Sequence, residues 1–316
     1  TYTVDWDASA AEKGGWDSFM DKEIHEDPAA VQRTLLGRFD TNGDITLDEV
    51  RIDEHDFKSI DKIIVVACGT ASYAGQVAKY AIEHWVRIPV EIELAHEFRY
   101  RDPILTPRTL VVAISQSGDT MDTLMALRHA REQGSKVLAI CNTQGASIPR
   151  ESDAVLYTHA GPEVAVASTK AYMVQIAVMY LFAFELALAV GNIDETECRR
   201  LVKLLQETPE VITGILEHKE QTQYIASSLI TADSLLYIGR GLDYALSMEG
   251  SLKLKEISYI HSESYAAGEL KHGTISLISD GMPVIAVATQ KALFEKTISN
   301  IKEVKARGAK VILVCR

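Results

Sequence analysis

Cysteine and proline are scarce in this chain, and acidic residues outnumber basic ones. The four cysteines, Cys68, Cys141, Cys198 and Cys315, are widely spaced and form no CxxC pair, so we expect neither disulfide bonds nor a structural zinc site. The formal net charge of −12 argues against nucleic acid or an anionic membrane surface as a partner. An anionic small molecule would therefore need a local site built to hold it.

Long apolar runs are also missing. The longest, residues 176–190, is short for a membrane span and contains Glu185, so it predicts a buried helix rather than a transmembrane one. With no secretory leader at its start, the chain is expected in the cytoplasm. Its 47% apolar and 24% charged residues are typical of a globular protein, and 316 residues suggest about two domains.

The most informative stretch is residues 110–122, LVVAISQSGDTMD. An apolar run ends in a cluster of hydroxyl residues with Gly118, and a helical pattern follows. Free backbone N–H groups and the positive end of the helix dipole make such a turn a good phosphate site. It has neither the Walker lysine nor the GxGxxG pattern, and it suits the single phosphate of a sugar phosphate. The alternative is a plain helix N-cap at Asp119 or Thr120.

Periodicity divides the chain into three parts. Residues 1–50 are polar and acidic, and they predict a lead-in of helical segments with a break at Pro28 and a turn, rather than a calcium loop, at Asp40–Asp44. After them strands and helices alternate, which predicts an α/β fold of parallel sheets flanked by helices. We place a first domain at residues 51–214 and a second at residues 215–316.

An internal repeat relates the two domains. The first copy starts at Val111 and reads VVAISQSGDTMDTLMALRHAREQGSKVLAIC; the second starts at Val284 and reads VIAVATQKALFEKTISNIKEVKARGAKVILVC. Both predict strand, loop, helix and strand, so we expect two copies of one α/β domain. In the second copy TQKAL replaces the hydroxyl cluster, and only the first copy looks equipped for phosphate. The second copy stops at Arg316, where the first continues, so we expect the second domain to be truncated.

Titratable groups crowd residues 251–273, SLKLKEISYIHSESYAAGELKHG. The spacing puts Lys253 and Glu256 on one face of a helix, and a carboxylate and a histidine beside a sugar can shuttle protons. The alternative is a solvated helix followed by a charged loop, which is the usual meaning of a charge run.

The chain resembles the isomerase half of the glutamine–fructose-6-phosphate aminotransferases, or glucosamine-6-phosphate synthases, in four motifs: CGTASYAG, SQSGDT, EVAVASTKAY and LKLKEISYIHSESYAAGELKHG. The likeness begins near residue 12, at a segment like the family's interdomain segment. It implies two tandem sugar isomerase domains of flavodoxin-like topology, in agreement with the repeat. It also implies an enzyme that makes glucosamine 6-phosphate from fructose 6-phosphate and glutamine, feeding UDP-N-acetylglucosamine synthesis, with no metal and no cofactor.

The resemblance implies roles for individual residues. Glu256 would move the proton between C1 and C2, and Lys253 would position or polarise the sugar. His272, supplied by the neighbouring subunit of a homodimer, would assist ring opening. A further set would hold the sugar and its phosphate: Cys68, Gly69, Thr70, Ser115, Gln116, Ser117, Thr120, Val166, Ala167 and Ser168.

Three departures from the family pattern narrow this expectation. The chain begins with Thr1 and not with the family's catalytic cysteine, so we expect a glutaminase domain only in a longer protein. It stops before the C-terminal lysine that forms a Schiff base with the sugar, and Ala71 stands where the family commonly has serine. We therefore expect a fragment of the synthase. The alternatives are a stand-alone amino-sugar-phosphate deaminase or isomerase, and a non-catalytic sugar-phosphate sensor, which would need neither Glu256 nor His272.

Overall fold

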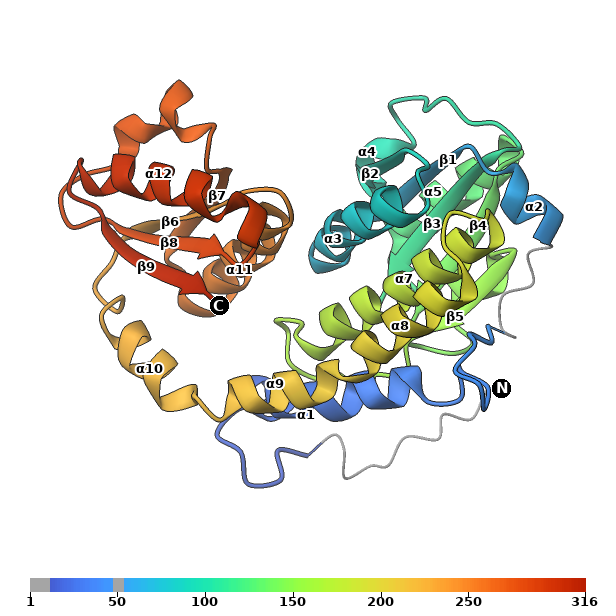
Figure 1. The fold of residues 1–316 in the computed structure, drawn as a ribbon, viewed down its shortest axis with the longest axis horizontal. Helices are drawn as coiled ribbons and strands as arrows, with labels where there is room; N and C mark the ends of the chain where they lie inside the picture. Colours follow the sequence, from blue (N-terminus) through green and yellow to red (C-terminus); the bar gives the residue numbers. More distant parts are fainter. Residues whose placement is uncertain (1–11, 48–53) are drawn as a thin grey trace. The chain divides into compact units, whose positions relative to one another are not determined.

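The computed structural model describes residues 12–47 and 54–316, and it divides the chain into two compact units, Thr1–Glu217 and His218–Arg316. From the sequence we placed this division between residues 214 and 215. The other predicted boundary, between residues 50 and 51, lies outside the described residues, as do residues 1–11 of the lead-in. In each unit a parallel sheet is flanked by helices (Figure 1), as the sequence predicted.

The first unit is built on a five-stranded parallel sheet with the order β2-β1-β3-β4-β5. This is the order of flavodoxin-like sheets, in which ligands bind at the carboxyl ends of the strands where the order reverses, here between β1 and β3. The strands are β1 (Lys62–Ala67), β2 (Val90–Leu94), β3 (Thr109–Ser115), β4 (Lys136–Cys141) and β5 (Ala154–Tyr157).

Both faces of this sheet carry an apolar core. Successive side chains of a strand point to opposite faces, so Ile63 and Val65 enter one core while Ile64 and Val66 enter the other. This explains why β1 is an unbroken apolar run. The helices of the unit are α1 (Phe19–Leu35), α2 (Glu54–Ser59), α3 (Thr70–Trp85), α4 (Ala95–Phe98), α5 (Met121–Glu132), α6 (Ser147–Glu151), α7 (Lys170–Ala189), α8 (Glu195–Gln206) and α9 (Thr208–Leu216).

Helix α7 is the central helix of the first unit. By length and composition it could cross a membrane, with a mean hydropathy of 1.7, but 72% of that apolar window is buried inside the protein. It packs against α1, α3 and α8, and Val178, Met179 and Phe182 lie in one of the two sheet cores. The prediction of a buried helix at residues 176–190 is therefore confirmed.

The predicted break at Pro28 is wrong, because α1 runs unbroken through it. A proline in a helix interior costs about 3 kcal/mol or more. Tertiary packing offsets that cost, since Ala30, Val31 and Leu35 are buried in a core shared with Val174 and Leu181 of α7. Local sequence rules see the proline and not this packing.

The predicted turn at Asp40–Asp44 is confirmed. Oδ1 of Asp40 accepts hydrogen bonds from the N–H groups of Asn42 (2.8 Å) and Asp44 (2.9 Å). Phe39 and Ile45 form an antiparallel bridge on either side, so the segment closes as a small hairpin. The backbone hydrogen bonds lower the pKa of Asp40.

The second unit holds a four-stranded parallel sheet with the order β7-β6-β8-β9, the same as the first four strands of the other unit. Its strands are β6 (Ser234–Gly239), β7 (His261–Ala266), β8 (Pro283–Ala288) and β9 (Lys310–Cys315). Its helices are α10 (Lys219–Ser227), α11 (Leu242–Ser258) and α12 (Phe294–Lys305), with short 3₁₀ turns η2 (Leu270–His272), η3 (Thr274–Leu277) and η4 (Lys291–Leu293).

The structure bears out the internal repeat. The β3–α5–β4 unit of the first sheet corresponds to β8–α12–β9 of the second, and β1–α3–β2 corresponds to β6–α11–β7. The helices α3 and α11 even begin alike: their N-caps Gly69 and Gly241 have φ 56° and ψ −134° and −126°. Part of the predicted charged loop after α11 is instead the edge strand β7, whose polar residues hid its strand character from the sequence.

Candidate sugar-phosphate site

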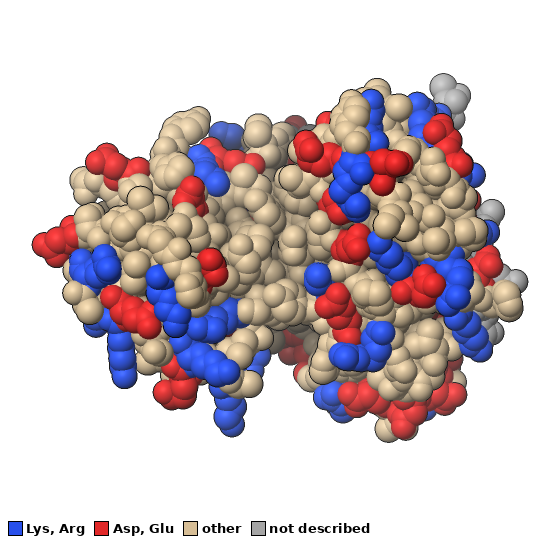
Figure 2. Space-filling view, turned by 90° about the horizontal axis from the view of Figure 1, so that it is seen from above, with Lys and Arg blue, Asp and Glu red and all other residues tan. Residues whose placement is uncertain are grey.

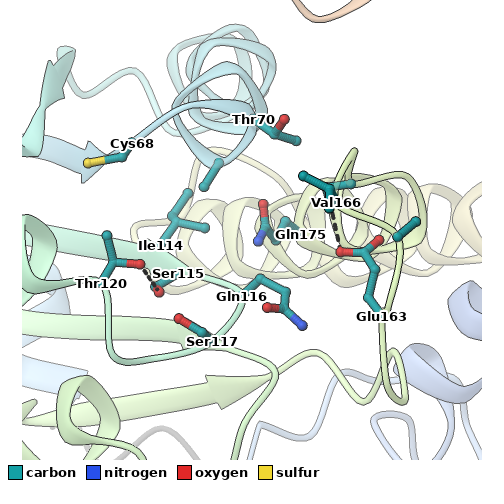
Figure 3. A pocket seen from close by; sticks show the side chains of 13 residues that line it. Cys68, Thr70, Ile114, Ser115, Gln116, Ser117, Thr120, Glu163, Val166 and Gln175 are labelled. Carbon is teal, nitrogen blue, oxygen red and sulfur yellow. Dashed lines mark hydrogen bonds between the residues drawn. The ribbon is translucent and has the colours of Figure 1, made fainter. Parts of the chain in front are cut away.

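A pocket of about 250 Å³ opens in the first unit near the carboxyl ends of β1 and β3 (Figure 3). Three segments form it: the β1–α3 turn, the β3–α5 turn, and the loop that leads into α7. The lining residues are Cys68, Thr70, Ala71, Ile114, Ser115, Gln116, Ser117, Thr120, Glu163, Ala165, Val166, Ser168 and Gln175. The location is the one at which an open sheet with this strand order binds its ligands.

Hydroxyl groups form one side of the pocket, where Figure 3 shows Ser115, Ser117 and Thr120 together. Oγ of Ser115 lies 3.0 Å from Oγ1 of Thr120 and accepts a hydrogen bond from the N–H of Gly118 (3.0 Å). Thr120 is the N-cap of α5, yet its hydroxyl pairs with Ser115 rather than capping the helix. The simple N-cap alternative therefore does not explain the hydroxyl cluster.

The hydroxyl turn is held rigidly against its neighbours. Gly118 has φ +74°, and a Cβ there would lie 2.6 Å from both Ala146 Cβ and Cys141 Sγ, so only glycine fits. Oδ1 of Asp119 accepts a hydrogen bond from the N–H of Ser147 (2.9 Å), and this bond lowers the pKa of Asp119. The turn is thus preorganised by contacts with the residues that follow β4.

The opposite side of the pocket carries Glu163 and Val166 (Figure 3). The Glu163 carboxylate accepts hydrogen bonds from Ser168 Oγ (2.9 Å) and from the N–H groups of Thr169 (2.9 Å) and Ala171 (3.1 Å). It therefore caps α7 and closes the loop before that helix. A carboxylate at a helix N-terminus is favoured by the helix dipole.

Gln175 brings an amide from α7 to the same pocket. It is only 3% exposed, and among the described residues its Oε1 has no hydrogen-bond partner. A buried polar atom without a partner is unfavourable unless a ligand or water satisfies it.

The pocket is equipped for a neutral or anionic ligand without a cationic side chain. Among the described residues that line it, none is a lysine or an arginine. A phosphate would be held by hydroxyls, by backbone N–H groups and by the positive end of the α5 dipole. Over the protein surface, on the face shown in Figure 2, Lys and Arg are interspersed with Asp and Glu.

The structure thus gathers most of the residues predicted to bind the sugar. Two predicted residues do not line the pocket. Gly69 lies beside it as the N-cap of α3, and Ala167 is buried within the loop before α7. Sequence reasoning assigned no ligand role to Glu163 or Gln175. Gln175 had a usable signal, because it is the lone amide in a helix that is largely apolar.

The equivalent place in the second unit is already filled. Asp243 stands two residues after the N-cap Gly241, as Ala71 stands two residues after Gly69. The carboxylate of Asp243 is buried and accepts hydrogen bonds from Thr289 Oγ1 (2.5 Å) and Thr289 N–H (3.0 Å). The N–H of Gln290 adds a longer one (3.4 Å). The second copy therefore carries an anion of its own where the first copy has an open pocket.

The predicted catalytic residues lie in the second unit. On α11, Lys253 Nζ lies 2.5 Å from Glu256 Oε2 and 3.5 Å from Glu249 Oε1, so the predicted shared face is confirmed. Glu256 is about one-third exposed, whereas Glu249 is buried. His272 lies on a different element, η2, and is exposed. No group of three or more His, Cys, Asp and Glu in residues 12–47 and 54–316 is placed to hold a metal ion.

Comparison with known proteins gives one family. A model described as the SIS domain matches residues 56–184 and 228–316. Glutamine–fructose-6-phosphate aminotransferase (isomerizing) from Corynebacterium efficiens is 58% identical over 317 residues, which cover 99% of this chain and 51% of that protein. The chain therefore spans about half the length of the curated relatives it matches.

Solved structures agree. The C-terminal domain of glucosamine-fructose-6-phosphate aminotransferase from Francisella tularensis matches with a TM-score of 0.93 and 39% identity, over 96% of this chain and 85% of that one. A glucosamine-6-phosphate deaminase from Thermotoga maritima shares the fold, with a TM-score of 0.76 at 22% identity over 94% of this chain and 85% of that one.

The chain belongs to the SIS domain family, with two copies of the domain in tandem. Within that family it belongs with the C-terminal half of the glutamine–fructose-6-phosphate aminotransferases.

Proposed function

We propose that this chain is the isomerase half of a glutamine–fructose-6-phosphate aminotransferase. It binds fructose 6-phosphate and carries out the ketose-to-aldose isomerisation that yields glucosamine 6-phosphate. A glutaminase domain, present in the full-length protein, supplies the nitrogen, and the product feeds UDP-N-acetylglucosamine synthesis. The protein acts in the cytoplasm as a homodimer.

One contrast between the two SIS copies carries this proposal. The first copy has an open pocket with a rigid hydroxyl turn at the N-terminus of α5, which suits an incoming phosphate. In the second copy the corresponding backbone donors are used by Asp243. The sugar phosphate is therefore bound by the first copy.

Within the proposal, the two units have different roles. Ser115, Ser117 and Thr120 anchor the phosphate, and Glu256 transfers the proton between C1 and C2 of the sugar as a general base and acid. Lys253, paired with Glu256 at 2.5 Å, positions or polarises the sugar. His272 assists ring opening from the neighbouring subunit, which is why a homodimer belongs to the proposal. The remaining predicted residues, Cys68, Gly69, Thr70, Gln116, Val166, Ala167 and Ser168, surround the sugar.

Binding by the hydroxyl turn is tested by the combined substitution Ser115→Ala, Ser117→Ala and Thr120→Ala. We expect the Kd for fructose 6-phosphate to rise about 100-fold, because about two net hydrogen bonds to a charged group are lost. Isothermal titration with fructose 6-phosphate, inorganic phosphate and fructose measures this. The loss of affinity should be confined to fructose 6-phosphate and inorganic phosphate, and the affinity for fructose should not change.

The control is Thr106→Ala, which removes a hydroxyl at the amino-terminal end of β3 in the same unit. It should leave all three affinities unchanged. If the triple variant binds fructose 6-phosphate as the unsubstituted chain does, the hydroxyl turn only shapes the start of α5 and the proposal is wrong.

A further inference from the structure

The connection between β5 and α7 is held by side chains of α1 and of the residues just after it. This connection supplies one wall of the pocket through residues 163–168, here called the wall loop. It forms neither helix nor strand, so its backbone groups need partners from elsewhere. Three side chains donate to carbonyl oxygens of this connection: Arg38 Nη2 to Tyr157 O, Thr34 Oγ1 to Thr158 O (2.5 Å) and Arg33 Nη2 to Ala160 O (3.0 Å). In the opposite direction, Glu23 Oε1 accepts from the N–H groups of Val164 (2.6 Å) and Ala165 (3.2 Å).

Among these contacts, Glu23 is the one that reaches the wall loop itself. Its side chain is buried, and its carboxylate accepts from two successive N–H groups, those of Val164 and Ala165. Burial raises the pKa of Glu23, while the two backbone hydrogen bonds act in the opposite direction. A buried carboxylate is costly, so its hydrogen bonds fix the loop backbone strongly.

The position held by Glu23 is next to the pocket. Ala165 lines it, and Val166, the following residue, lines it with a fully exposed side chain. The end of the same connection is also tied to α1, because the buried Lys170 Nζ lies 2.5 Å from Glu26 Oε2. Helix α1 therefore contacts the connection both before and after the wall loop.

We propose that Glu23 of α1 is a positioning residue for the sugar pocket, because it holds the wall loop at the place where it meets the ligand. Helix α1 precedes the first SIS match at residue 56, so a segment outside the SIS domains takes part in binding. The inference rests on the proposed sugar-phosphate binding. It assigns to α1 a role in ligand recognition in addition to its packing against α7.

The test compares Glu23→Gln with Arg33→Met in this chain. Both remove a polar contact between α1 and the same connection, but Arg33 contacts Ala160, three residues before the wall loop. Titration calorimetry gives the Kd for fructose 6-phosphate and for inorganic phosphate. Hydrogen exchange of peptides spanning residues 160–170 reports on the Val164 and Ala165 amides.

For Glu23→Gln we expect faster exchange in the wall loop and an increase of about tenfold in the Kd for fructose 6-phosphate, since one charge-assisted hydrogen bond is worth about that factor. The Kd for inorganic phosphate should stay within about twofold, because phosphate contacts the hydroxyl turn alone. For Arg33→Met both Kd values should stay unchanged. If Glu23→Gln does not fold, the same measurements are made on Glu23→Asp, which shortens the side chain by one methylene.

Three results would overturn the inference. The first is an unchanged Kd for fructose 6-phosphate in Glu23→Gln, and the second is an equal rise in the Kd values for fructose 6-phosphate and inorganic phosphate in that variant. The third is a rise in the Kd for fructose 6-phosphate in Arg33→Met as large as that in Glu23→Gln. Each would mean that Glu23 only stabilises the fold. Failure of the unsubstituted chain to bind fructose 6-phosphate contradicts the proposed function and, with it, the ligand role of α1. Unchanged exchange of the two amides contradicts the hydrogen bonds of Glu23 independently of any ligand.

Discussion

Four carboxyl groups gather around one lysine beneath the wall loop. Asp27, Glu23 and Glu26 come from α1, Glu163 from the loop and Lys170 from the start of α7. Burial, followed by the charge of Glu163, raises the pKa of Asp27 from 3.8 to about 7. Among the described residues, Oδ1 of Asp27 is buried without a hydrogen-bond partner. Asp27 is therefore partly protonated near pH 7.

This protonation predicts a pH dependence of stability. In the folded protein Asp27 keeps its proton up to about pH 7, whereas in the unfolded chain it loses it near pH 3.8. Between these values the folded state binds more protons, so the free energy of unfolding falls as pH rises, by up to about 1.4 kcal/mol per pH unit. Asp27→Asn cannot ionise, and it should be more stable than the unsubstituted chain above pH 7. Urea unfolding at pH 5, 6, 7 and 8 measures the difference.

The matched control for this prediction is Asp17→Asn, at an exposed position just before α1. It should follow the unsubstituted chain at every pH. A constant difference between Asp27→Asn and the unsubstituted chain from pH 5 to 8 would show that Asp27 ionises normally in the folded protein.

At the scale of elements, the strand–turn–helix unit occurs twice with opposite outcomes. After the shared glycine N-cap, the first copy has Ala71 at the pocket and the second has Asp243, whose carboxylate occupies the donors of the β8–α12 turn. At this position a methyl group in the first copy corresponds to a carboxylate in the second, and that carboxylate accepts hydrogen bonds from Thr289 and Gln290. The two turns have kept the same backbone arrangement while only one remains open.

Removing that internal anion should destabilise the second unit. Asp243→Ala leaves the partly buried donors of Thr289 and Gln290 without their acceptor, which costs at most about 1–3 kcal/mol per group. We expect a lower melting temperature that inorganic phosphate partly restores, because phosphate can take the place of the carboxylate. Thermal unfolding with and without phosphate, in the Ser115→Ala, Ser117→Ala, Thr120→Ala background, isolates this effect from the first pocket.

The conservative variant Asp243→Asn retains one acceptor oxygen and should lose less stability than Asp243→Ala. Equal stability of the unsubstituted chain, Asp243→Ala and Asp243→Asn would mean that water hydrogen-bonds the donors of Thr289 and Gln290. The proposal that Asp243 keeps a phosphate out of the second copy would then be wrong.

At the scale of the whole molecule, an enzyme and a sensor differ in the residues that they need. A sensor needs the phosphate pocket alone, whereas an isomerase also needs a base. Glu256→Gln, in a full-length protein that includes the family's C-terminal lysine, should reduce the interconversion of fructose and glucose 6-phosphate by about 10²- to 10⁴-fold. Binding of the sugar phosphate should persist. A coupled assay for glucose 6-phosphate, together with titration calorimetry, measures both.

Glu295→Gln serves as the control, since it neutralises an exposed carboxylate on α12 in the same unit. It should leave turnover unchanged. Full turnover in Glu256→Gln would remove this residue from the role of base and favour a sensor or a different catalytic group.

Much of the fold follows from local patterns in the sequence. The apolar runs of β1 and β3, the helical periodicity and the repeat from Val111 and Val284 predict two parallel sheets flanked by helices, because side-chain periodicity reports which faces of an element are buried. The flavodoxin-like topology was implied by the family resemblance. The hydroxyl turn at Ser115–Thr120 is likewise a contiguous motif. Edge strand β7 and the unbroken helix at Pro28 escaped these rules, since both depend on neighbours that are distant in the sequence.

The sequence by itself therefore determined the α/β class, the duplication and the hydroxyl turn, because each is visible in contiguous stretches of chain. Only the tertiary structure decided which distant groups meet. Glu23 reaches Val164 across 141 positions, Asp243 fills the turn at Thr289 across 46, and Gln175 enters a pocket built by two other loops. Such contacts depend on how whole helices pack, and packing is the sum of many weak interactions that no local pattern contains.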